Sequence, residues 1–246
     1  MNRSYLAKKN DDRLHCQELI RKTAIHEAGH VAAIHLGNQA KQLPPVFFQI
    51  FISEQIKTRF SRGIQQPVHQ HFAKVKGGRL IHSLPFSLQV AVQTLTEDEE
   101  AAFHCAFEAD IINLLAGPLA EAKYVALHDD EPINPRLVNL DSLRYYGGAS
   151  DLKTVREYLD CLLIDQKQKD MKVFELFLAA YDFINAPSHW NAITALADFI
   201  IESGKEIIHC EEAIDILDKT ISNWDFSEQE SGLAAQTFQT YAETVR

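Results

Sequence analysis

Two histidines and a glutamate lie close together in the run His26-Glu27-Ala28-Gly29-His30. Residues at positions i and i+4 of an α-helix lie on one face, about 5–6 Å apart at Cβ. Two imidazole nitrogens placed in this way can bind one Zn²⁺ at about 2.0–2.1 Å. The intervening glutamate would lie beside a water at the metal, where it can accept a proton as the water attacks a carbonyl. The motif predicts a zinc site of the metallopeptidase type, with His26 and His30 as ligands and Glu27 as general base.

A catalytic zinc site uses three protein ligands and leaves one position for water, so the two histidines need a partner. Asp151, which follows the run Gly147-Gly148-Ala149-Ser150, is the first candidate. An acid at this position also has a purely structural explanation, because Ser150 is a good helix N-cap and Asp151 would complement the helix dipole. Other carboxylates compete for the role of third ligand, namely Glu108, Asp110 and Glu121. Spacing alone leaves the choice open.

A motif this short also arises by chance. In that case His26 and His30 would be surface histidines or hydrogen-bonded core histidines of an ordinary helix. The surrounding pattern favours the zinc site, because apolar residues recur at core-type spacings on a helix expected over about residues 15–36. Gly29 inside this helix costs about 1 kcal/mol relative to alanine, so we expect a closely packed segment next to it.

The elements that must position these residues follow from apolar spacing, caps and breaks. Residues 46–52 (VFFQIFI) are dense in β-branched and aromatic types, which predicts a strand. Thr96 and Glu99 form a capping box at the start of a helix that should run to about residue 127, with a kink at Pro118. Short strands and loops are expected over 53–93 and a loop over 129–149. Further helices are expected over about 151–164, 169–184, 188–203 and 209–223.

These elements predict a mainly α fold of the α+β type. A zincin-like helix would lie beside a small β-sheet, followed by a helical C-terminal region. We expect one domain over residues 1–246, with subregions 13–128 and 129–224 and a polar tail over 225–246.

Composition excludes several classes of function. The 246-residue chain has a net charge of −10, and its Lys and Arg occur only in short clusters. Such a chain offers no basic stripe for a phosphate backbone, so we expect no nucleic-acid partner. The four cysteines form no C-x-x-C pair, and no apolar signal region or membrane-length apolar run occurs. We expect a soluble cytoplasmic protein with reduced thiols, and His69 and His71 exposed on a loop.

Three segments resemble one family of zinc peptidases. Thr23-Ala24-Ile25-His26-Glu27-Ala28-Gly29-His30 resembles the active-site helix of the FtsH family, the membrane-anchored, ATP-dependent peptidases of peptidase family M41. Residues 113–121 (NLLAGPLAE) resemble that family's L-x-G-G/A-x-A-A-E-E helix. Residues 147–152 (GGASDL) resemble its G-A-S-x-D-L segment, and residues 189–201 are similar to its C-terminal helices. The resemblance implies a Zn²⁺ cofactor, Asp151 as third ligand and hydrolysis of polypeptides.

The chain also departs from the family. It has no G-x-x-x-x-G-K-[ST] motif for an ATPase module and no anchoring membrane helix, so the likeness is to a stand-alone peptidase domain. Pro118 and Ala122 replace residues of the family's second motif, and the segment before Asp151 is one residue shorter. Without a motor, the substrates would be unfolded or short polypeptides, or would be delivered by a separate ATPase. The other expected partner is a second copy in a homo-oligomer.

Three functions stay open at this point. The favoured one is a zinc-dependent endopeptidase, in which residues 46–52 either present an edge to an extended peptide or form an ordinary core strand. The second is an inactive metal-binding scaffold or regulatory subunit related to FtsH proteases. Glu27 argues against it, because a structural zinc needs no base and normally has four protein ligands. The third is a helical interaction domain over residues 151–223 in which the motif is incidental.

Overall fold

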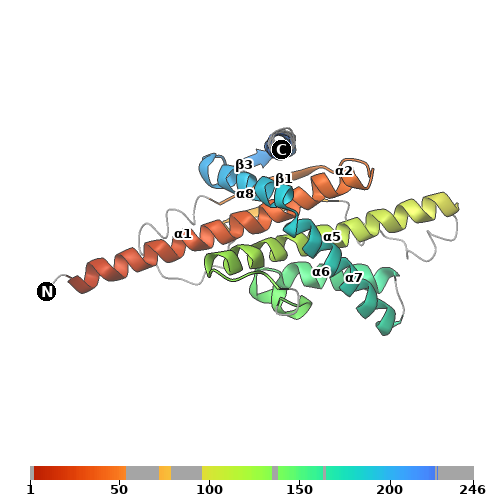
Figure 1. Ribbon diagram of the computed structural model, residues 1–246, viewed down its shortest axis with the longest axis horizontal. Helices are drawn as coiled ribbons and strands as arrows, with labels where there is room; N and C mark the ends of the chain where they lie inside the picture. The colour runs from red at the N-terminus through yellow and green to blue at the C-terminus, as the bar shows by residue number, and fades with distance from the viewer. Residues whose placement is uncertain are drawn as a thin grey trace, which may run out of the picture.

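The computed structural model of the protein describes residues 3–53, 72–78, 96–134, 138–162, 165–224 and 226 (Figure 1). Within these ranges the chain is mainly helical with one small antiparallel sheet, which confirms the predicted fold class at this level. Every helix in them is too short or too polar to traverse a lipid bilayer. Most of the strands and loops expected over 53–93, the histidines 69 and 71, and nearly all of the tail from 225 lie outside the described residues.

The longest helices pack along one another at the centre of the fold. Helix α1 (Arg3–Ala32) continues into a π-helical turn, η1 (Ala33–Gly37), and a short helix, α2 (Asn38–Ala40). It lies against α5 (Glu97–His128) and α8 (Pro187–Glu202). Fully buried alanines at i, i+4 spacing on α1 (Ala24, Ala28 and Ala32) permit this close approach. The helix begins at Arg3, well before the expected start near residue 15. The polar residues ahead of that point carry no apolar period from which an earlier start could be predicted.

Helix α5 begins as its capping box predicts. The Thr96 hydroxyl accepts a hydrogen bond from the Glu99 amide, and the Glu99 carboxylate accepts one from the Thr96 amide. The helix is continuous across Pro118, although proline has no N–H to donate to the preceding turn. One uninterrupted element therefore runs beneath the whole of the site described below.

The C-terminal half is helical, as expected, with two additions. The segment expected as a loop contains a 3₁₀ helix, η3 (Leu140–Tyr145), which leads into α6 (Ala149–Leu162). Helices α7 (Gln166–Asn185) and α8 follow, and residues 210–224 are also helical. A short strand, β3 (Ile207–His209), precedes that last segment and was not predicted.

The sheet has the strand order β2-β1-β3, and both pairs of strands are antiparallel. Strand β1 (Phe48–Ile52) confirms the predicted strand, and Ile50 in it lies opposite Val75 of β2 (Ala73–Gly77). Of the two alternatives for residues 46–52, the core strand is confirmed and the open edge is wrong, because β3 pairs with the other side of β1 and makes it the central strand. Among the described residues, β2 is the strand at the edge beside α1.

Candidate metal centre

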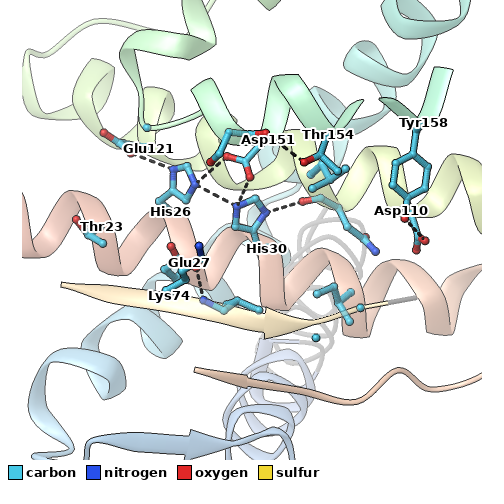
Figure 2. A pocket seen from close by; sticks show the side chains of 18 of the residues that line it. Thr23, His26, Glu27, His30, Lys74, Asp110, Glu121, Asp151, Thr154 and Tyr158 are labelled. Atoms are coloured by element: carbon cyan, nitrogen blue, oxygen red, sulfur yellow. Dashed lines mark hydrogen bonds and ion pairs between the residues drawn. The ribbon is translucent and has the colours of Figure 1, made fainter. Parts of the chain in front are cut away.

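Metal-binding side chains from two helices meet at one point (Figure 2). His26 and His30 lie one turn apart on α1, and Asp151 lies in the first turn of α6. His26 Nε2 is 3.1 Å from His30 Nε2 and 3.5 Å from Asp151 Oδ2, and His30 Nε2 is 3.8 Å from Asp151 Oδ1. Ligand atoms of a tetrahedral zinc with bonds of 2.0–2.1 Å are about 3.3 Å apart. The cluster of His26, His30 and Asp151 can therefore hold a metal ion.

The outer nitrogens of both histidines are already hydrogen-bonded. His30 Nδ1 lies 2.7 Å from the main-chain oxygen of Asn113, and His26 Nδ1 lies 3.0 Å from Glu121 Oε2. A carbonyl and a carboxylate only accept hydrogen bonds, so both Nδ1 atoms must donate. In the neutral tautomers both Nε2 atoms are then acceptors, and they face each other and the Asp151 carboxylate. Three acceptors that face one another with no donor among them can be satisfied by a shared proton or by a metal ion.

The charges in the site favour a cation at this point. Burial alone would lower the pKa of His26, but hydrogen bonds to Asp151 and Glu121 and the charges of Glu27 and Asp151 raise it from 6.5 to about 10. Burial would likewise raise the pKa of Asp151, yet the charge of His30 and the hydrogen bond to His26 hold it below its ordinary value. A proton on His26 thus supplies the positive charge that a bound metal ion would supply instead.

Two glycines allow α1 and α5 to approach closely at the site. A Cβ at Gly29 would lie 2.8 Å from both the Ala116 oxygen and Ala120 Cβ, which confirms the expected close neighbour of this glycine. A Cβ at Gly117 would lie 2.3 Å from His30 Nε2. The ring of His30 therefore occupies the space that any side chain at position 117 would need.

The paired glycines before α6 bring Asp151 to the histidines. Gly147 has a φ of +71°, which favours glycine, and a Cβ there would lie 2.9 Å from His26 Nδ1. A Cβ at Gly148 would lie 2.7 Å from the Pro118 ring, so this turn rests directly on α5. The shorter segment before Asp151 therefore still places the carboxylate beside both Nε2 atoms.

Glu27 is buried, with 7% of its surface exposed, and lines the same cavity as the histidines. The main-chain N–H of Val75 in β2 donates a 2.7 Å hydrogen bond to its Oε2 atom. This bond fixes the orientation of the carboxylate and also ties α1 to β2 (Figure 2). The predicted general base thus lies at the site, held by β2, which lies within the range in which short strands were expected.

The site opens into a cavity of about 440 Å³ between α1, α5, α6 and β2. Among the residues that the structure describes, four carboxylates and one lysine line it and make it acidic: Glu27, Asp110, Glu121, Asp151 and Lys74. Asp110 lies at one end, where Tyr158 donates a 2.9 Å hydrogen bond to its Oδ2 atom. A volume of this size suits a small molecule or part of a peptide.

The carboxylates that were alternatives to Asp151 as third ligand make other contacts. Glu108 lies outside the cavity lining and forms a 2.9 Å ion pair with Lys172 of α7. Glu121 bonds the outer nitrogen of His26 rather than facing the Nε2 atoms. The sequence singled out Glu121 only as a competing ligand and gave no sign of Asn113. The i, i+4 spacing of Gly117 and Glu121 could have indicated a shared face, but Asn113 acts through its main-chain oxygen, which no residue type reveals.

Comparisons of the chain with models of known protein families, with curated proteins and with solved structures find no match. The resemblance to the FtsH family stays a prediction from short motifs. Function must therefore be argued from the site itself.

Proposed function

We propose that the protein is a zinc-dependent endopeptidase that hydrolyses unfolded or short polypeptides. One observation carries the proposal: the two Nε2 atoms and the Asp151 carboxylate, all acceptors, converge on one point at the edge of an acidic cavity. The same arrangement supports a zincin-like domain related to the FtsH family. Two of the three motifs that resemble that family supply these groups, and the third supplies the partners of the outer nitrogens of the histidines.

Zinc is the metal that fits the donor set together with Glu27. Two imidazoles and one carboxylate hold catalytic zinc, which keeps a fourth position open, and also non-haem iron(II). The glutamate next to the first ligand in the H-E-x-x-H motif favours zinc over iron. Calcium and magnesium prefer sites built from oxygen ligands, so the two nitrogens disfavour them. Glu121 and Asn113, which bind the outer nitrogens, would orient His26 and His30 toward the ion and increase their basicity.

Glu27 has the position expected of a general base. When bound, zinc supplies Lewis acidity, which polarises a carbonyl and lowers the pKa of water. Glu27 would accept the proton of the attacking water and pass it to the leaving amine. Val75 holds Oε2 of Glu27 in place, so the carboxylate needs no reorganisation for either transfer.

The edge strand β2 offers a place for an extended substrate. Lys74, Val75 and Gly77 of this strand line the cavity. The Val75 N–H points away from β1 but already donates to Glu27, so a substrate would use the other main-chain groups of this edge. An extended peptide can add to such an edge through main-chain hydrogen bonds, whatever its sequence. A polypeptide substrate is therefore favoured over a small metabolite.

One observation favours a second candidate, an inactive metal-binding scaffold or regulatory subunit. The hydrogen bond from Val75 gives Glu27 a structural role between α1 and β2. If Glu27 serves only to hold α1 and β2 together, its presence does not indicate hydrolysis. The two candidates share the metal site and differ only in whether Glu27 moves protons.

Cleavage of an unfolded protein by the zinc-loaded chain tests the proposal. We expect wild-type protein to cleave casein, Glu27→Gln to bind zinc stoichiometrically without cleaving it, and Glu18→Gln, a control on the same helix, to behave as wild type. Metal analysis and gel or mass-spectrometric detection of fragments give both readouts. A wild-type protein that binds zinc and cleaves no unfolded or peptide substrate, alone or with a partner ATPase, would establish the scaffold instead.

A further inference from the structure

The cavity extends well beyond the metal ligands. Asp151, Thr154 and Tyr158 lie at i, i+3 and i+7 on one face of α6, and all three line the cavity. Seven residues of helix span about 10 Å, so Tyr158 lies roughly that far from Asp151 along the helix axis. Asp110 of α5 meets Tyr158 there, and both side chains are almost fully buried. A buried, hydrogen-bonded acid thus lies at a fixed distance from the metal ligands.

Apolar side chains line the cavity on two of its helices. Ile34 lies one turn beyond His30 on α1, and Leu114 lies one turn from Asp110 on α5. Apolar lining beside a buried carboxylate suits a side chain with an aliphatic stem and a cationic tip. The acidic lining of the cavity as a whole favours positive charge in the same way.

We propose that the Asp110–Tyr158 end of the cavity binds the ammonium or guanidinium group of a lysine or arginine near the cleaved bond of the substrate. This inference rests on the proposed peptidase function, because it takes the cavity to be the substrate site. Asp110 accepts hydrogen bonds from the cation, and the Tyr158 hydroxyl holds the carboxylate in position. Asp110 is thus a specificity residue, and Tyr158 is a positioning residue.

A free N-terminal amine fits this geometry less well. The ammonium of an N-terminal residue lies directly beside its own carbonyl, whereas the Asp110 pair lies about two helical turns from the metal ligands along α6. A charge at the end of a long side chain reaches the pair while the carbonyl stays at the histidines. The site therefore favours a basic side chain over the amine of the residue that carries the attacked carbonyl.

Binding to the zinc-loaded Glu27→Gln protein tests this inference without requiring cleavage. The probes are two fluorescently labelled, unstructured peptides that differ only in one residue, lysine in one and norleucine in the other. A hydrogen bond to a charged group contributes about 1.5–3 kcal/mol, so we expect the lysine peptide to have a Kd lower by about tenfold or more. Asp110→Asn should reduce the ratio of the two Kd values to near one, and Tyr158→Phe should reduce it partly.

The control is Glu108→Gln, which removes an acid from the same helix outside the cavity and should leave the ratio unchanged. If Asp110 only stabilises the fold, Asp110→Asn should lower the melting temperature and leave the ratio of the two Kd values unchanged. Equal affinities for the two peptides, including no measurable binding of either, or a lysine preference that survives Asp110→Asn, overturns the inference. If the preference holds but wild-type protein cleaves neither peptide, the peptidase proposal fails and the basic-residue site stands.

Discussion

The α-carbon of Gly117 in α5 lies directly against the imidazole ring of His30 in α1. A methyl group at position 117 would come within 2.5 Å of His30 Cε1 and still closer to Nε2, so the ring would have to move. We therefore expect Gly117→Ala to weaken zinc binding by at least about tenfold, the scale of effect seen when ligand orientation is lost. Competition with a chromophoric zinc chelator measures the change.

Gly37 provides the matched control. A Cβ at Gly37 would meet nothing within 4 Å, and its backbone is helical. Gly37→Ala should leave zinc affinity unchanged and stabilise the fold by about 0.4–1 kcal/mol. Equal zinc affinities in the two alanine variants would contradict the role assigned to the close approach at Gly117.

Loss of the carboxylate behind His26 should weaken metal binding without abolishing it. Glu121 accepts the hydrogen bond from His26 Nδ1, and removal of such an outer partner typically lowers metal affinity 10–100-fold. We expect Glu121→Gln to show a loss in that range, and Asp151→Asn, which alters a proposed ligand itself, to show a larger one. Isothermal titration with Zn²⁺ ranks the two variants. A Glu121→Gln protein with wild-type affinity would show that the hydrogen bond is dispensable.

The pH dependence of the metal-free protein should report on His26. Burial alone lowers the pKa of His26, but bonds to Asp151 and Glu121 and nearby negative charges raise it from 6.5 to about 10 in the folded state. A histidine with a raised pKa stabilises the fold fully below its unfolded value and loses this contribution as pH rises through the folded value. The free energy of unfolding should therefore fall between about pH 6.5 and about pH 10.

Urea unfolding in the presence of a chelator, at steps of pH, measures this slope. His26→Asn serves as the reference, because it removes the titrating ring and keeps a polar side chain. We expect the wild-type curve to fall more steeply than that of the variant over this interval. Parallel curves would mean that His26 titrates near its ordinary pKa in the folded protein.

A buried lysine links α5 to the end of α7, away from the cavity. Lys123 Nζ donates a 2.9 Å hydrogen bond to the Ile184 oxygen and lies 4.5 Å from the centre of the Trp190 ring. Carbonyls in the last turn of a helix have no partner within the helix, so this lysine caps α7. Lys123→Met should lower the free energy of unfolding by about 1–3 kcal/mol while zinc affinity stays unchanged. A parallel loss of zinc binding would show that the two regions are coupled.

The sequence allowed the main helices and the groups that meet at the site to be predicted for physical reasons. Apolar spacing fixes the buried face of a helix, and the Thr96 capping box marks the start of α5. His26, His30 and Asp151 were singled out by residue type and spacing, with help from the family resemblance, and the fold brings them together. Their role as zinc ligands stays a prediction.

Other features carry no signal in residue type. Strand β3 has three residues, too few for a period-two pattern to be recognised, and its pairing with β1 decides which strand forms the edge. The contacts of Asn113 with His30 and of Val75 with Glu27 use main-chain atoms, which every residue except proline offers equally. Such partners become visible only when segments distant in the sequence are placed side by side.

The placement of the donors on α1 and α6 has one more consequence. An ion held by His26 and Asp151 would join two stretches of backbone that are separated by most of the sheet and all of α5. It would act as a removable cross-link that stabilises the folded state, because the site exists only when α1 and α6 are packed together. Removal of the ion by a chelator should therefore abolish hydrolysis and also loosen α6 from α1. The chain should then be digested faster by added proteases.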